Sequence, residues 1–91
     1  MGEVYFDIDR GELFKHDKAI KITSTEITLL KILAKNSRKT IARHKLCDET
    51  GVSERSIDVQ VTRLRKKIEM DPKNPRFIQT VWGAGYSLIP D

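Results

Sequence analysis

The run from residue 54 to residue 69 constrains this chain most, because its hydrophobic side chains recur at helical spacing. At about 100° per residue, one narrow stripe of a helix would carry Ile57, Val61, Leu64 and Ile68. Ser53 precedes the run as a candidate N-cap, and Asp71–Pro72 follows it, where proline cannot continue a helix. The run therefore predicts an amphipathic helix from Glu54 to about Glu69 with its stripe in a core.

The face opposite this stripe has an unusual composition. It carries Arg55, Val59, Thr62, Arg63 and Lys66, with Asp58 and Lys67 toward its flanks. An exposed β-branched valine gains nothing from water, but Val59 could contact a thymine methyl group in DNA, and Arg63 could pair with guanine. Thr62 and Asp58 are short enough to read or exclude a base edge. The alternative is that Val59 is an ordinary exposed valine or packs on a neighbouring loop.

Charge is distributed unevenly along the chain. The net charge is +4, yet residues 1–14 carry a net −3, so the remaining residues carry +7. Four basic residues fall within positions 63 to 67. Such a cluster is either a solvated helix face or a phosphate-binding surface, and on the second interpretation the phosphate contacts would be Arg55, Arg65, Lys66 and Lys67.

Short β-prone segments come first in the chain. They are Val4–Ile8, Leu13–Lys15 and Ala19–Ile22, and they predict a small antiparallel sheet. A helix is predicted next, from about Ser24 to Lys35, because Thr23 can cap it while Glu26 completes a capping box.

Further elements give the order of a helix-turn-helix with a wing. We expect a short strand at Thr40–Ala42, a helix from Arg43 to Thr50 ended by Gly51, and a hairpin of Phe77–Val81 and Tyr86–Ile89 around a glycine-rich tip. The predicted fold class is α+β: a winged helix-turn-helix formed by residues 1–91 as one domain, with an N-terminal antiparallel sheet, three helices and a C-terminal β-hairpin wing.

Composition argues against several kinds of site. Cys47 is the only cysteine, so no intrachain disulfide can form, and no segment approaches the roughly 20 apolar residues of a membrane span. We expect a soluble protein of the cytoplasm. His16, His44 and Cys47 do not make a zinc set, and Gly83–Ala84–Gly85 lacks the lysine of a phosphate-cradling loop. No catalytic residues, cofactor or metal are therefore expected.

Trp82 stands beside the predicted hairpin tip. It could stack at a DNA backbone or pack beneath the hairpin, and the large area of a tryptophan side chain favours packing. Thr80 and Ser87 could donate hydrogen bonds to phosphates.

Two long motifs resemble the effector domains of OmpR/PhoB-type response regulators. They are Arg55–Ser56–Ile57–Asp58–Val59–Gln60–Val61 with Arg63–Leu64–Arg65–Lys66–Lys67–Ile68, and Ile78–Gln79–Thr80–Val81–Trp82–Gly83–Ala84–Gly85–Tyr86. The resemblance extends over nearly the whole chain. It also includes Ile22–Thr23, Glu26, Leu29–Leu30 and Leu33, and the segment from Arg43 to Leu46.

The resemblance implies a particular fold and site. The fold would have a four-stranded N-terminal sheet, three helices and a hairpin wing. Base-facing positions would be Asp58, Val59, Thr62 and Arg63; phosphate-facing positions would be Arg55, Gln60, Arg65 and Thr80; and the wing would include Trp82, Gly83, Gly85 and Ser87. Many members have arginine at the position of Trp82, where it enters the minor groove, and tryptophan carries no such charge.

The resemblance also implies partners. Family members regulate transcription, dimerise on tandem half-sites of double-stranded DNA about one helical turn apart, and carry a receiver domain that a sensor histidine kinase phosphorylates. These 91 residues contain no receiver, so the chain is either an excised fragment or a stand-alone domain. The connection from Asp48 to Ser53 is shorter than the loop with which many relatives contact RNA polymerase, which leaves activation and repression both open.

Two other functions compete with DNA binding. A winged-helix protein-interaction module would use Val59 and Trp82 as anchors, and its affinity would depend little on salt. RNA binding is the weaker alternative, because we expect no exposed aromatic platform of the kind that binds single strands.

Overall fold

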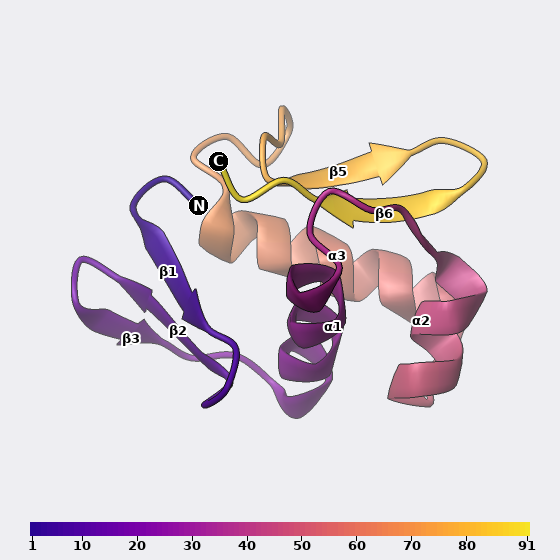
Figure 1. Ribbon diagram of the computed structural model, residues 1–91, viewed down its shortest axis with the longest axis horizontal. Coiled ribbons are helices and arrows are strands. Elements are labelled where there is room, and N and C mark those ends of the chain that lie inside the picture. Colours follow the sequence, from indigo (N-terminus) through magenta and orange to yellow (C-terminus); the bar gives the residue numbers. More distant parts are fainter.

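The computed structural model describes residues 1–91 and contains three helices and two small antiparallel sheets (Figure 1). The strands are β1 (Val4–Asp7), β2 (Glu12–Lys15), β3 (Lys18–Ile20), β4 (Ile41–Ala42), β5 (Ile78–Val81) and β6 (Gly85–Leu88), and the helices are α1 (Ser24–Lys35), α2 (Arg43–Thr50) and α3 (Glu54–Ile68). The N-terminal sheet lies at one end of the helices, and the C-terminal hairpin runs along α3. This order confirms the predicted winged helix-turn-helix architecture.

The N-terminal sheet differs from the expectation of four strands. It contains three, in the order β1-β2-β3. The only other strand before α2 is the two-residue β4, which pairs with β6 in the second sheet, Ile41 opposite Tyr86. A fourth N-terminal strand does not form because the chain leaves β3 at Ile20 to reach the cap of α1 at Thr23.

The capping box of α1 is present as predicted. The amide of Glu26 donates to Thr23 Oγ1 at 3.1 Å, and the amide of Thr23 donates to Glu26 Oε1 at 2.9 Å. Glu26 is fully buried, and Lys67 Nζ from α3 lies 2.8 Å from its Oε1. One carboxylate therefore both starts α1 and ties it to α3.

The core contains the hydrophobic stripe of α3. Ile57, Val61 and Leu64 are fully buried and Ile68 nearly so. They pack in one cluster with residues of both sheets and of the other two helices. The stripe therefore fixes which face of α3 points away from the core.

The end of α3 is set by Glu69. Its buried carboxylate accepts hydrogen bonds from the backbone amides of Arg76, Phe77 and Ile78 at 2.8–3.1 Å. The helix consequently stops at Ile68, one residue before the predicted end, and the loop after it is held at the start of β5.

Gly85 lets the C-terminal sheet close. Its φ is 154°, and a Cβ built there would lie 2.0 Å from the carbonyl oxygen of Ile41. Only glycine permits β4 to approach β6 this closely. The wing is therefore attached to the body of the domain at the start of α2.

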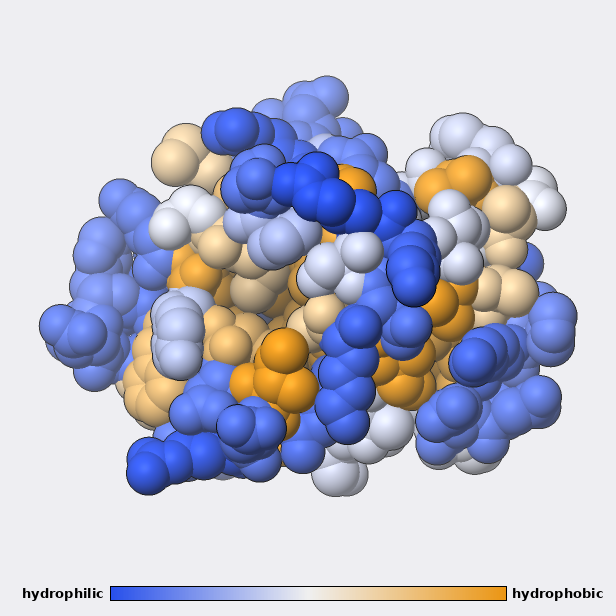
Figure 2. All heavy atoms as spheres, viewed as in Figure 1, coloured by the Kyte–Doolittle hydropathy of each residue, from blue (hydrophilic) through white to orange (hydrophobic).

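Hydrophilic side chains cover much of the face seen in Figure 2, with apolar atoms exposed between them. No helix is both long and apolar enough to cross a membrane.

Candidate nucleic-acid interface

The outward face of α3 brings several of the predicted residues together. Val59 is 42% exposed, and together with Asp58 and four exposed polar side chains it lines a shallow hollow of about 340 Å³. The four are Arg55, Thr62, Arg63 and Lys66. Ser53 positions this face by capping α3, since its Oγ accepts from the Ser56 amide at 3.1 Å.

The three basic groups of this hollow are available to a ligand. No hydrogen bond or ion pair within the chain engages the charged ends of Arg55, Arg63 and Lys66. A second hollow of about 530 Å³ continues the surface past the end of α3, where Lys66 and the exposed Lys73 line it together with Asp71. Lys73 was missed by the sequence analysis because it lies in a loop outside the helical pattern.

Two of the predicted phosphate contacts have partners inside the fold. Arg65 donates from Nε and Nη2 to the Ile78 carbonyl at 3.0 and 2.8 Å and from Nη2 to Thr80 Oγ1 at 2.8 Å. Arg65 thereby attaches α3 to β5, and the Thr80 hydroxyl is already engaged as the acceptor of one of these hydrogen bonds. Lys67 is paired with Glu26. Arg65 still lines the second hollow beside Lys66, but β5 engages its guanidinium and Glu26 engages the charge of Lys67. Neither residue is therefore an unpaired cation of this surface.

Gln60 and Ser87 are also turned inward. The Oε1 atom of Gln60 is buried, and nothing in the structure explains its lack of a hydrogen-bond partner. Ser87 is 5% exposed, like the rest of the buried strand β6, so it offers little surface to a phosphate. The expected phosphate contacts of these two residues are therefore not supported by their placement.

The expectation that Trp82 packs beneath the hairpin is wrong. Its side chain is 90% exposed beside Gly83 and does not lie beneath the hairpin. Trp82 lies in the turn between β5 and β6, beyond the last paired residues Val81 and Gly85, so neither strand covers it. One exposed tryptophan is not a platform on which successive bases stack, so the expectation that the chain lacks such a platform stays a prediction.

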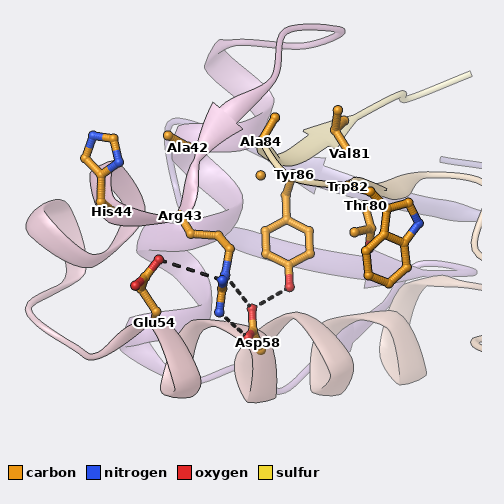
Figure 3. A pocket seen from close by; sticks show the side chains of 12 residues that line it. Ala42, Arg43, His44, Glu54, Asp58, Thr80, Val81, Trp82, Ala84 and Tyr86 are labelled. Atoms are coloured by element: carbon orange, nitrogen blue, oxygen red, sulfur yellow. Dashed lines mark hydrogen bonds and ion pairs between the residues drawn. The ribbon is translucent and has the colours of Figure 1, made fainter.

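A polar cluster lies between the wing and α3 (Figure 3). Asp58 Oδ1 accepts from Arg43 Nε at 3.1 Å and from the Tyr86 hydroxyl at 2.6 Å, while Asp58 Oδ2 accepts from Arg43 Nη2 at 2.5 Å. Arg43 Nη1 is also 3.7 Å from Glu54 Oε1. The cluster joins the first residue of α2, the second turn of α3, and β6.

The protonation states of the cluster follow from these contacts. The hydrogen bond to Asp58 raises the pKa of Arg43 despite partial desolvation. Burial, together with the hydrogen bond to Asp58, raises the pKa of Tyr86 to about 12. At neutral pH both Arg43 and Tyr86 are therefore protonated donors. Sequence reasoning missed both residues, because their partner lies 15 and 28 positions away in the chain.

This cluster borders a further hollow of about 410 Å³. Trp82, His44 and Glu54 line it along with the cluster residues. Burial raises the pKa of the Cys47 thiol, which keeps it in the unreactive form. No group of three or more His, Cys, Asp or Glu side chains is placed to hold a metal ion.

The chain as a whole resembles known regulators in sequence as well as in fold. A family model described as "Transcriptional regulatory protein, C terminal" matches residues 17–88. Protein PetR of Rhodobacter capsulatus is 43% identical over 101 aligned residues, which cover 100% of this chain and 43% of PetR. This chain therefore spans less than half the length of that relative.

Two solved structures have the same fold. The response regulator DrrB of Thermotoga maritima, described as an OmpR/PhoB homolog, superposes with a TM-score of 0.88 at 36% identity, covering 98% of this chain and 42% of DrrB. The RstA DNA-binding domain of Klebsiella pneumoniae, solved in complex with the RstA box, superposes with a TM-score of 0.84 at 26% identity, covering 99% of this chain and 94% of that domain.

Proposed function

This chain belongs to the family of C-terminal domains of transcriptional regulatory proteins, and from that premise we propose that it binds double-stranded DNA sequence-specifically to regulate transcription. The observation that carries the proposal is the outward face of α3. It holds three unpaired basic side chains around the exposed Val59, on the side opposite the buried stripe. The complex of the RstA DNA-binding domain with its box supports the same role for a related domain.

In this proposal α3 enters the major groove, which is about 12 Å wide and admits a helix. Arg63 pairs with guanine, Val59 contacts a thymine methyl group, and Thr62 faces a base edge. Arg55, Lys66 and Lys73 hold phosphates and set the register.

We further propose the assembly in which the domain acts. It is the output part of a two-component response regulator, whose receiver domain is phosphorylated by a sensor histidine kinase. Two copies occupy tandem half-sites about one helical turn apart. The short connection between α2 and α3, residues 51–53, gives no support to contact with RNA polymerase.

Selection from a random duplex library tests the proposal. The wild-type domain is expected to recover a defined motif, and Arg63→Ala is expected to lose preference at one position of it. Lys66→Ala is the matched control, because loss of a phosphate contact weakens binding to all sequences alike. No enrichment by the wild type, or equal losses on motif and scrambled DNA for both variants, would contradict the proposal.

A protein-interaction module remains the second candidate, because Trp82 and Val59 are exposed hydrophobic side chains. Such an interface would bury apolar area, and its affinity would change little with salt. Phosphate binding instead lowers log affinity by about 0.9 per contact for each unit of log salt. Titration at several salt concentrations separates the two functions.

A further inference from the structure

Trp82 is a large apolar side chain on a surface that continues from α3. It is 90% exposed and lies in the turn that joins β5 to β6. It lines the wing-side hollow of about 410 Å³ together with Asp58, and Asp58 also lines the basic hollow around Val59. The tip of the wing therefore extends the proposed DNA-binding face of α3.

Two side-chain contacts fasten the wing to α3 close to this tip. Arg65 donates to Thr80 Oγ1 at 2.8 Å. Tyr86 donates its hydroxyl to Asp58 Oδ1 at 2.6 Å. The indole and the Tyr86 ring are both turned from the wing toward α3 (Figure 3). The tip of the wing therefore has a defined place relative to the helix.

The tip itself carries no charge. It consists of residues 81–85, which are Val, Trp, Gly, Ala and Gly. The charged side chains that border the hollow come from α2 and α3, namely the carboxylates of Asp58 and Glu54 and the guanidinium of Arg43. A phosphate finds no cation at the tip, whereas the indole offers a broad apolar surface. The part of a duplex that complements this surface is the apolar wall and floor of a groove.

The placement of the tip indicates which groove this is. With α3 in the major groove, the DNA strand that borders this groove runs past the wing-side hollow, and the tip beyond that strand lies over the adjacent minor groove. Trp82 follows the tethered Thr80 by two residues, about 7 Å of extended chain. The minor groove is about 7.5 Å deep, so the indole can enter it.

The width and stiffness of the minor groove then decide which sequences accept a tryptophan. A-tracts are stiff and narrow, and their strong negative potential attracts basic side chains, which the wing tip does not offer. Pyrimidine–purine steps such as TA and CA/TG are easily kinked, and apolar side chains can act as wedges between base steps in the minor groove. An uncharged indole therefore fits the second class of sequence and not the first.

We propose that Trp82 inserts into the minor groove beside the site of α3 and selects a flexible pyrimidine–purine step there over an A-tract. The inference rests on the proposed DNA binding and adds a second contact, which reads the deformability of DNA through an apolar side chain. The preference is opposite to the one that an arginine at the same position would have.

Intrinsic fluorescence tests the contact directly, because Trp82 is the only tryptophan in the chain. The probe is a duplex that carries the motif recovered by the wild-type domain, with a TA step in the flanking minor groove. Binding should lower the acrylamide quenching constant of the tryptophan severalfold, since the groove shields the indole. The same motif without its flank should still bind, and should leave the quenching constant near that of the free protein.

Anisotropy of the same duplex separates the two possible failures. Binding with an unchanged quenching constant would overturn the inference and leave the proposed function intact. Absence of binding by any selected duplex would overturn both.

Library selection tests the sequence preference. The wild-type flank should be enriched in pyrimidine–purine steps over A-tracts by about fivefold. Trp82→Ala should lose this preference while the motif read by α3 is still recovered, and Trp82→Arg should reverse it toward A-tracts. A flank preference that Trp82→Ala retains would overturn the inference.

Tyr5→Ala is the matched control. Tyr5 is also an exposed aromatic residue, with 64% of its surface accessible, but it lines neither hollow of the proposed interface. Its removal should leave the flank preference unchanged, and an equal loss in Tyr5→Ala would overturn the assignment to Trp82. Thermal unfolding checks that each variant is folded.

Discussion

At the scale of single residues, Glu26 performs two tasks with one buried carboxylate. It closes the capping box by accepting the amide of Thr23, and it pairs with Lys67 from another helix. Burial alone would raise the pKa of Glu26, but the hydrogen bonds from Lys67 and Thr23 outweigh burial and lower it.

Glu26→Gln should lower the free energy of unfolding by about 2 kcal/mol at neutral pH, since charge-assisted hydrogen bonds are lost. The pH dependence should change as well. Because the folded-state pKa lies below the ordinary value of 4.5, the stabilisation is present above pH 4.5 and is lost as pH falls through the lower pKa.

Urea unfolding of both proteins between pH 7 and pH 3 measures this effect. Wild-type stability should decline toward that of Glu26→Gln as the solution becomes acidic. A constant difference between the two proteins over this range would show that the Glu26 charge contributes nothing.

Trp82 contrasts with the buried Glu26, because it has the largest side chain in the chain and yet contributes little to the core. With 90% of the side chain exposed, Trp82→Ala should change the free energy of unfolding by less than about 0.5 kcal/mol. Thermal unfolding measures this change. A loss of several kcal/mol would mean that the indole is packed against the hairpin after all.

At the scale of elements, the attachment of the wing depends on one glycine. Gly85→Ala would place a Cβ 2.0 Å from the carbonyl oxygen of Ile41, so β4 and β6 would have to separate. We expect a loss of about 3 kcal/mol or more, comparable to the most damaging single substitutions.

Gly83 provides the matched control for this prediction. It also has a positive φ, 76°, but a Cβ there would have no atom within 4 Å. Gly83→Ala should therefore cost only about 1 kcal/mol of backbone strain. Similar losses for the two variants in chemical denaturation would exclude close approach of β4 as the cause.

The sequence could predict elements whose signals are local: α1 and α2 have the predicted bounds, and cap residues indicated the start of α1 and the end of α2. Thr23 and Glu26 are three residues apart, and Gly51 ends α2 with a φ of 76°. The roles of Arg65 and Lys67 could not be predicted in this way. Lys67 pairs with a residue 41 positions away, and the pattern of charges along a helix carries no information about such a partner.

The same difference between local signals and long-range contacts decides which parts of the candidate site could be predicted. Val59, Arg63 and Lys66 were predicted to share an outward face because helical periodicity alone fixes it. The link from Asp58 to Arg43 and Tyr86 depends on how the wing packs on α3, which no local pattern encodes. The exposure of Trp82 likewise depends on what packs against the turn of the hairpin, which no local pattern encodes.

At the scale of the whole molecule, salt limits which charges act on a ligand at the face of α3. The domain measures 34 × 25 × 20 Å, which exceeds the Debye length of about 8 Å at physiological ionic strength. Exposed charges farther than this length from a bound duplex are therefore largely screened, and the contacting cations should dominate the salt dependence of binding.

This screening gives the last prediction. With Arg55, Lys66 and Lys73 as phosphate contacts, log affinity should fall with log salt with a slope of about −3, and Lys66→Ala should reduce its magnitude by about 0.9. Lys18→Ala removes an equally exposed lysine from β3 that lines neither hollow of the proposed interface, and should leave the slope unchanged. Fluorescence anisotropy of a labelled duplex at several salt concentrations measures both slopes, and an equal reduction in the two variants would indicate attraction by net charge instead of contact at this face.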